Sequence, residues 1–271
     1  PPPDRARLSD GKRLIYDGFV QAIAEGTETS AAGILVDEEF GADIARAARQ
    51  AGHLLAMPVE KSGQDEFDFE YEDWTDHISR FDPSFSKVLV RYNPDGDGEM
   101  NARQAERLQR LGDWLHQNSR LFLFELLVPA EAAQLESVGG DEGRYDTEVR
   151  PALMVRAIAE LQEAGVDPDI WKIEGIDARE DCERISAQTR SGQERENVAC
   201  VVLGRGADDA AVDHWLKMGS GVPGYVGFAI GRTIWNKPLK AFIAGDADRE
   251  TAAKQIAANY RRFIDVYESA S

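Results

Sequence analysis

Apolar residues recur along the chain in two alternating patterns, as short runs and as longer stretches with helical spacing. The short runs predict strands near residues 33–36, 53–58, 87–92, 121–128, 169–174, 199–203 and 225–230. The longer stretches predict helices near residues 12–25, 42–51, 101–118, 150–164, 179–190, 208–218 and 249–267. Residues 1–11 are proline-led and charged, so we expect an irregular arm there. Strands that alternate with helices predict a parallel sheet with helices packed outside it.

The positions of polar residues at the ends of the predicted strands indicate whether the sheet is open or closed into a barrel. An open doubly wound sheet gathers its ligand groups at one switch point, whereas a barrel builds its active site from the ends of several strands. Here such groups follow nearly every strand: Asp37 and Glu38, Glu60 and Lys61, Arg91, Asn93 and Asp95, Glu125, Lys172 and Glu174, Gly204 and Arg205, and Gly231 and Arg232. No dinucleotide fingerprint or P-loop follows a strand. We therefore predict an α/β fold of the (β/α)8 TIM-barrel type.

The start of the chain does not fit that barrel simply. A TIM barrel opens with a strand, whereas the first predicted element here is the helix of residues 12–25. We expect that the first strand is missing from the sequence or that the N-terminal arm stands in its place. The length of 271 residues and the 42% hydrophobic content suit one TIM-barrel domain over residues 1–271.

Composition narrows the choice of partners and compartment. The formal net charge of −18 would repel nucleic acid and anionic membranes. Cys182 and Cys200 are the only cysteines, too few for a disulfide framework, which fits a reducing cytoplasm. No apolar run approaches the roughly 20 residues of a membrane span, and no signal-peptide pattern occurs. We predict a cytoplasmic protein with a small-molecule ligand, and a homo-oligomer remains possible.

Lys172 lies at the centre of the predicted strand 169–174. Strand alternation places Ile170, Lys172 and Glu174 on one face. A buried lysine loses its charge more easily, and the neutral amine can attack a carbonyl to form a Schiff base. The alternative is that Lys172 only forms a buried ion pair with Glu174 or another carboxylate.

Two further charged residues lie in apolar strands. Glu125 is the one charged residue of the run 121–128, and burying it costs several kcal/mol unless it is paired or neutral. It is a candidate general acid and base beside Lys172, or else it anchors an arginine. Lys87 and Arg91 share a strand face four residues apart and could line the interior. For Lys87, a solvated strand end is an equal alternative.

The last two strands each end in a glycine followed by an arginine: Gly204 and Arg205, then Gly231 and Arg232. Glycines allow backbone amides to approach an anion, arginine supplies a planar donor fork, and the loops after the last two barrel strands commonly bind phosphate. We predict a phosphate site there, against the alternative of ordinary turns with surface-paired arginines. The four histidines form no metal spacing, so we predict no catalytic metal.

Several stretches together resemble a known family. They are ILVDEEFG (34–41), PVEKSGQ (58–64), KVLVRYNPDGD (87–97), FELLVP (124–129), PDIWKIEG (168–175), VVLGRG (201–206) and GFAIGRTIW (227–235). In this order they resemble the aldolase-like domain fused to the C-terminus of bacterial 5-dehydro-2-deoxygluconokinase, and standalone versions of that domain are more similar still. That family in turn resembles the tagatose 1,6-bisphosphate and sulfofructose phosphate aldolases, which are metal-independent class I barrels.

The resemblance implies roles for these residues. Lys172 would be the Schiff-base lysine, Glu125 the carboxylate that shuttles protons, Lys87 a lysine near it, and Arg205 and Arg232 the phosphate ligands. The other candidates for substrate contact are Arg91, Asp37, Glu60, Glu174, Gly204 and Gly231.

The implied reaction is cleavage of a phosphorylated keto sugar or keto acid, with 2-deoxy-5-keto-gluconate 6-phosphate as the leading substrate, to dihydroxyacetone phosphate and an aldehyde without a cofactor. The alternatives are an aldolase for another sugar phosphate or sulfosugar phosphate, and a non-catalytic sugar-phosphate sensor. Two departures bear on the substrate. Many fused members have Tyr-His-Pro-Asp where this chain has Tyr-Asn-Pro-Asp at 92–95, and the family's first strand is absent.

Overall fold

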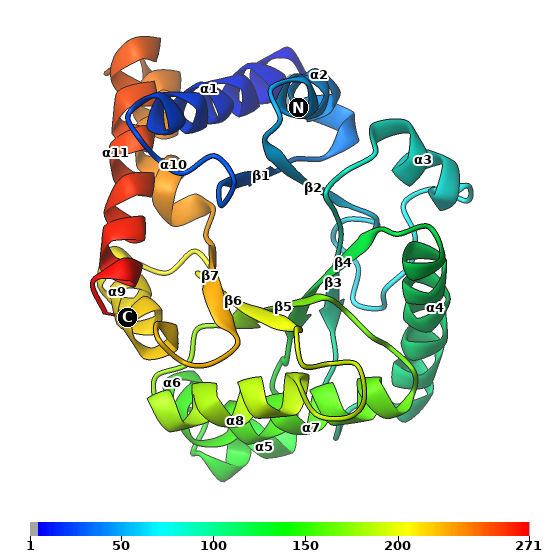
Figure 1. The fold of residues 1–271 in the computed structure, drawn as a ribbon. Coiled ribbons are helices and arrows are strands. Elements are labelled where there is room, and N and C mark those ends of the chain that lie inside the picture. The colour runs from blue at the N-terminus through cyan, green and yellow to red at the C-terminus, as the bar shows by residue number, and fades with distance from the viewer. Residues whose placement is uncertain (1–4, 271) are drawn as a thin grey trace.

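A curled parallel sheet forms the centre of the computed structural model, which describes residues 5–270 (Figure 1). Each of the seven strands pairs with the next one along the chain. The strands are β1 (Gly33–Leu35), β2 (Leu54–Pro58), β3 (Phe85–Arg91), β4 (Leu121–Leu127), β5 (Ile170–Glu174), β6 (Ala199–Leu203) and β7 (Tyr225–Ala229). Within residues 5–270 no pairing joins β1 to β7. The fold is a TIM-like α/β barrel, of which the described residues supply the seven strands that the sequence predicts.

Helices surround the sheet on its outside (Figure 1). Those that join or flank the strands are α1 (Arg5–Ala24), α2 (Glu38–Gln50), α3 (Trp74–Phe81), α4 (Gly98–Gln117), α7 (Arg150–Glu163), α8 (Arg179–Thr189), α9 (Asp209–Gly219), α10 (Arg232–Ala244) and α11 (Arg249–Glu268). Between β4 and α7 lie three short turns, α5 (Ala132–Ser137), α6 (Glu142–Arg144) and the π-helical η1 (Tyr145–Val149). No helix within residues 5–270 is long and apolar enough to cross a membrane.

The predicted irregular arm is wrong for residues 5–11, which form the first turns of α1, while residues 1–4 lie outside the described part of the chain. These turns are helical because they pack. Gly11 is buried so closely that a Cβ there would lie 3.3 Å from Leu239 of α10. Arg5 donates to Glu39 of α2 at 2.8 Å and lies over the ring of Phe40. The charged composition of the segment reflects these contacts rather than a lack of structure.

Some helices were not predicted, because their apolar periodicity is short or interrupted. The helix α3 has only eight residues, and Asp73 caps it by accepting from the backbone N–H of Asp76. The helix α10 contains Pro238, which ordinarily argues against a helix interior. It nonetheless packs against α11, and Ile234 and Pro238 are buried. Tertiary packing outweighs local propensity in both elements.

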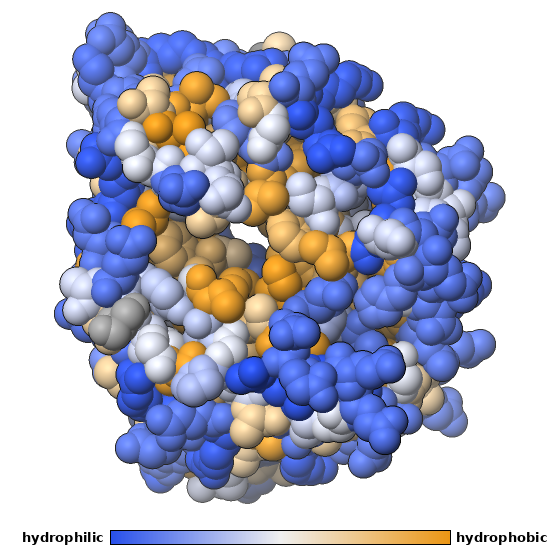
Figure 2. Space-filling view, in the orientation of Figure 1, coloured by the Kyte–Doolittle hydropathy of each residue, from blue (hydrophilic) through white to orange (hydrophobic). Residues whose placement is uncertain are grey.

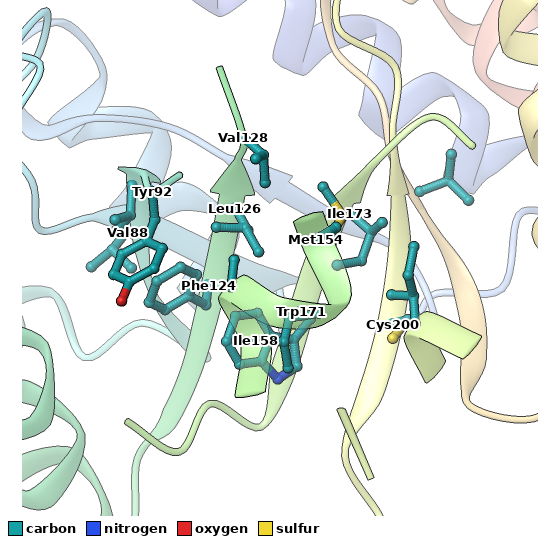
Figure 3. Packing of buried hydrophobic residues seen from close by; sticks show 14 of the residues in the cluster. Val88, Tyr92, Phe124, Leu126, Val128, Met154, Ile158, Trp171, Ile173 and Cys200 are labelled. Carbon is teal, nitrogen blue, oxygen red and sulfur yellow. The ribbon is translucent and has the colours of Figure 1, made fainter. Parts of the chain in front are cut away.

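The outer face of the sheet carries the main core. Phe124 and Trp171, adjacent in register on β4 and β5, have ring centroids 4.8 Å apart and no exposed surface. They pack towards Met154 and Ile158 of α7, which are also fully buried (Figure 3). Alternation along each strand therefore turns the neighbouring residues, among them Lys172 and Glu125, to the inner face.

The inner face is less completely filled. Leu35 on β1 and Leu121 on β4 belong to it by register, and they are 50% and 44% exposed. Figure 2 shows hydrophobic residues around a central opening, with hydrophilic residues over the outer rim. Four charged side chains of the inner face, those of Lys87, Glu125, Lys172 and Glu174, are in contrast less than a tenth exposed.

Candidate active site

Four charged side chains from four consecutive strands meet on the inner face. Glu125 and Lys172 are direct register partners on β4 and β5, and Lys172 Nζ lies 3.1 Å from Glu125 Oε2. Lys87 on β3 places its Nζ 3.1 Å from the same oxygen and 2.6 Å from Oε1 of Glu60, just beyond the end of β2. Ammonium and carboxylate groups thus alternate across the sheet, and Lys87, Glu125 and Lys172 are each less than a tenth exposed.

This arrangement lowers the pKa of both Lys172 and Glu125. Burial lowers the pKa of Lys172, and the cation of Lys87 adds to that, so the pKa lies below its usual value despite the attraction of Glu125. Burial alone would raise the pKa of Glu125, but the ammonium groups of Lys172 and Lys87 outweigh it and hold that pKa below its usual value. Lys172 is therefore an amine that gives up its proton more easily than an ordinary lysine, beside a carboxylate that stays ionised.

The pKa values of Lys87 and Glu60 are instead both raised. Burial lowers the pKa of Lys87, but the carboxylates of Glu60 and Glu125 outweigh it and raise the pKa above its usual value. Burial raises the pKa of Glu60 despite the nearby ammonium of Lys87. Lys87 is the permanent cation of the group, and the alternative of a solvated strand end is wrong for it because its side chain is only 6% exposed.

Glu174 does not pair with Lys172, although both lie on the inner face of β5. It accepts from the backbone N–H of Val128 at 2.9 Å, and its other oxygen lies 3.2 Å from Nε of Arg205. Burial raises the pKa of Glu174 despite the cations of Arg150 and Arg205. The ion-pair alternative for Lys172 therefore involves Glu125 and not Glu174.

Arg150 and Asp146 complete this second cluster, and sequence reasoning missed both. Arg150 is 1% exposed and donates to Asp146 Oδ1 at 2.9 Å and to the carbonyl of Gly175 at 3.0 Å. Asp146 also accepts from Arg205 at 2.7 Å. The i, i+4 spacing of Asp146 and Arg150 was a weak signal in the sequence, since such pairs usually lie on exposed helix surfaces. Here Asp146 of the π-helical turn η1 contacts Arg205, and Arg150, the first residue of α7, contacts the carbonyl of Gly175.

The two predicted phosphate arginines lie side by side at the carboxyl ends of β6 and β7. Nη2 of Arg232 donates to the backbone carbonyl of Arg205 at 3.1 Å. Gly206 has φ of 75°, a conformation that favours glycine, and a Cβ there would lie 2.8 Å from Cζ of Arg232. Arg205 itself has φ of 50°, a left-handed conformation uncommon for a non-glycine residue. The strained loop therefore places the guanidinium of Arg232 against the backbone of Arg205, whose own guanidinium pairs with Asp146 and Glu174.

The remaining predicted contacts lie around this centre. Asp37 caps α2 by accepting from the N–H of Phe40 and pairs with Lys12, so its carboxylate is already occupied. Arg91 donates to the carbonyl of Gln64 at 2.8 Å. Gly204 and Gly231 flank the arginine loops, with Gly231 just before the first residue of α10. No group of three or more histidine, cysteine, aspartate or glutamate side chains suited to a metal occurs within residues 5–270.

Comparison with known proteins places this geometry in an aldolase-like fold. Fructose-bisphosphate aldolase from Plasmodium falciparum, solved with TRAP and a small-molecule inhibitor, is similar with a TM-score of 0.60 and 12% identity, over 88% of this chain and 78% of that one. Cgl0159 from Corynebacterium glutamicum is similar with a TM-score of 0.60 and 16% identity, over 94% of this chain and 76% of that one. At these identities the likeness concerns the fold alone.

The sequence itself identifies the family. Residues 2–271 match the family described as an uncharacterized protein conserved in bacteria, DUF2090, and the chain belongs to it. No curated protein sequence matches the chain. The resemblance to an aldolase is thus one of fold.

Proposed function

We propose that the protein is a class I aldolase that cleaves a phosphorylated ketose or keto acid. The observation that carries the proposal is the buried Lys172 amine with a lowered pKa, 3.1 Å from the ionised carboxylate of Glu125. A neutral amine in such a place is the nucleophile of Schiff-base chemistry, and a carboxylate within reach is its general acid and base.

The reaction follows from these two groups. The Lys172 amine adds to the ketone carbon of the substrate, and loss of water gives an iminium. Glu125 then takes the proton of the hydroxyl on the carbon beyond the bond to be broken, the carbon–carbon bond breaks, and its electron pair moves to the iminium nitrogen to give an enamine. The hydroxyl carbon leaves as an aldehyde. Protonation of the enamine and hydrolysis release dihydroxyacetone phosphate and restore the amine.

The buried position of Lys172 favours catalysis over binding alone. A sugar-phosphate sensor has no need of a desolvated amine, because burying two lysines and two carboxylates costs several kcal/mol before their pairing offsets it. By resemblance the leading substrate is 2-deoxy-5-keto-gluconate 6-phosphate, and another sugar phosphate or sulfosugar phosphate is the second candidate. Borohydride reduction in the presence of dihydroxyacetone phosphate, followed by peptide mass analysis, tests the proposal. A modified Lys172 supports it, and an unmodified protein contradicts it.

Arg205 and Arg232 are proposed to bind the phosphate. Replacing Arg232 by alanine should raise KM about tenfold to a hundredfold for phosphorylated substrates, since a charge-assisted bond contributes roughly 1.5–3 kcal/mol. Non-phosphorylated analogues should lose much less. The Arg261→Ala variant is a matched control, because Arg261 is an exposed arginine of α11 paired with Glu25. Equal losses for both kinds of substrate would make Arg232 a structural residue.

A further expected result concerns metals, because Lys172 is proposed to do the polarising that a metal ion does in the other aldolase class. Turnover should persist in EDTA, measured as release of dihydroxyacetone phosphate through a coupled dehydrogenase. Loss of turnover in EDTA that zinc restores would contradict the class I assignment.

A further inference from the structure

Charged groups are distributed unequally on the two sides of Lys172. On one side, beyond the ends of β6 and β7, the guanidinium groups of Arg205, Arg232 and Arg150 outnumber the carboxylates of Glu174 and Asp146, with which Arg205 and Arg150 pair. On the other side, β4, β3 and β2 present Glu125, Lys87 and Glu60 in that order. This inference rests on the proposed function. If the phosphate lies at the arginines and the ketone carbon at Lys172, the half of the substrate that leaves as an aldehyde extends along Glu125, Lys87 and Glu60.

The side of the aldehyde carries an excess of negative charge. Beyond Lys172, which lies 3.1 Å from Glu125, the one ammonium is that of Lys87, and it is shared between Glu60 at 2.6 Å and Glu125 at 3.1 Å. The next cation along β3 is Arg91, whose Nη1 donates to the carbonyl of Gln64. A carboxylate on the departing aldehyde would meet these two anions at close range, where the low dielectric of a buried site strengthens repulsion.

Glu60 also keeps an acceptor unused. Its Oε1 accepts from Lys87 at 2.6 Å, whereas its Oε2 is buried and has no hydrogen-bond partner. The Glu60 side chain is 12% exposed. A buried carboxylate oxygen without a donor is costly, and a hydroxyl group brought by a ligand would satisfy it.

We propose that the departing aldehyde is an uncharged, hydroxylated one, and that Glu60 determines this specificity by accepting a hydrogen bond from its hydroxyl group. The proposal selects a ketose phosphate over a phosphorylated keto acid, and therefore over 2-deoxy-5-keto-gluconate 6-phosphate, the substrate that the resemblance favours. Lys87 serves to hold Glu60 and Glu125 in place, so its ammonium is already shared by two carboxylates.

The reaction run in the direction of addition tests the proposal with defined probes. Dihydroxyacetone phosphate is offered with glyceraldehyde, propanal or succinic semialdehyde, and kcat/KM is measured for each aldehyde. The parent should prefer glyceraldehyde over both others. The E60Q variant, which keeps the shape but not the charge, should lose about tenfold to a hundredfold of the preference for glyceraldehyde over propanal. Preference of the parent for succinic semialdehyde would overturn the proposal without any variant.

A control variant and the adduct assay distinguish the role of Glu60 from the aldolase activity itself. Glu70→Gln makes the same change at an exposed position of the same loop and should leave the preferences unchanged. An adduct of dihydroxyacetone phosphate on Lys172 in parent and E60Q, with the same aldehyde preferences in both, would overturn the role of Glu60 and leave the aldolase intact. Absence of the adduct in the parent would overturn the proposed function and this inference with it.

Discussion

The Lys172→Met variant should lose carbon–carbon bond cleavage entirely and form no borohydride-reducible adduct. Methionine keeps the length and the apolar stem of lysine but has no amine, so the packing changes little while the nucleophile is gone. The fold should survive, because Glu125 retains its second ammonium partner, Lys87, at 3.1 Å. Cleavage rate, adduct mass and melting temperature are the measurements.

The control for this variant is Lys217→Met on α9, where the lysine is exposed. It should behave as the parent in all three measurements. A Lys172→Met protein that still forms a reducible adduct would move the nucleophile to another lysine, of which Lys87 is the nearest on the sheet. A variant that unfolds, with an intact adduct in the parent at a peptide other than residues 170–174, would make Lys172 one half of a structural ion pair.

The Glu125→Gln variant should separate the two chemical steps. Cleavage should fall by about 10²–10⁴-fold, since glutamine cannot accept the hydroxyl proton. The adduct of dihydroxyacetone phosphate on Lys172 should still form, because the attraction of Glu125 raises the pKa of Lys172 and its removal leaves the amine more easily neutral. Single-turnover cleavage and the borohydride trap measure the two steps. Loss of both together would show that Glu125 acts before the bond-breaking step.

Stability gives an independent check on the charge of Glu125. Its folded-state pKa is held below the usual value of 4.5, so the ionised carboxylate stabilises the fold above that pH, and the contribution is lost as pH falls through the lower folded-state pKa. Glu125→Gln should therefore be less stable than the parent near neutral pH, with the difference shrinking towards strongly acidic pH. Urea unfolding at several pH values measures it, and a constant difference would mean that Glu125 carries a proton in the parent.

The strands were predictable because a strand of a parallel sheet is buried on both faces, so its sequence is a nearly continuous run of apolar residues. The segment 199–203 coincides with β6, and the others differ by a residue or two at their ends. The start of α1 was not predictable in the same way, since residues 5–11 are charged and their helix depends on contacts with α2 and α10. The local sequence does not reveal that Gly11 packs against Leu239, more than 200 residues further along the chain.

The candidate site was likewise only partly predictable from the sequence. Alternation alone placed Lys172 and Glu174 on one face of β5, but it could not say which carboxylate lies against the amine. The register with β4 decides that it is Glu125, and the turn η1 brings Asp146 and Arg150 to Glu174 and Arg205. Glu60 gains its place only because β2 lies beside β3, which sets its carboxylate 2.6 Å from Lys87.

By itself the sequence determined the kinds of elements, their order, and which residue types stand at the strand ends, because apolar periodicity and strand alternation are local properties of the chain. The tertiary structure decided which charges are neighbours and which are desolvated. Those two facts set the pKa of Lys172, the ionisation of Glu125 and the unused acceptor of Glu60, since electrostatic interactions depend on separation in space and on burial rather than on distance along the chain.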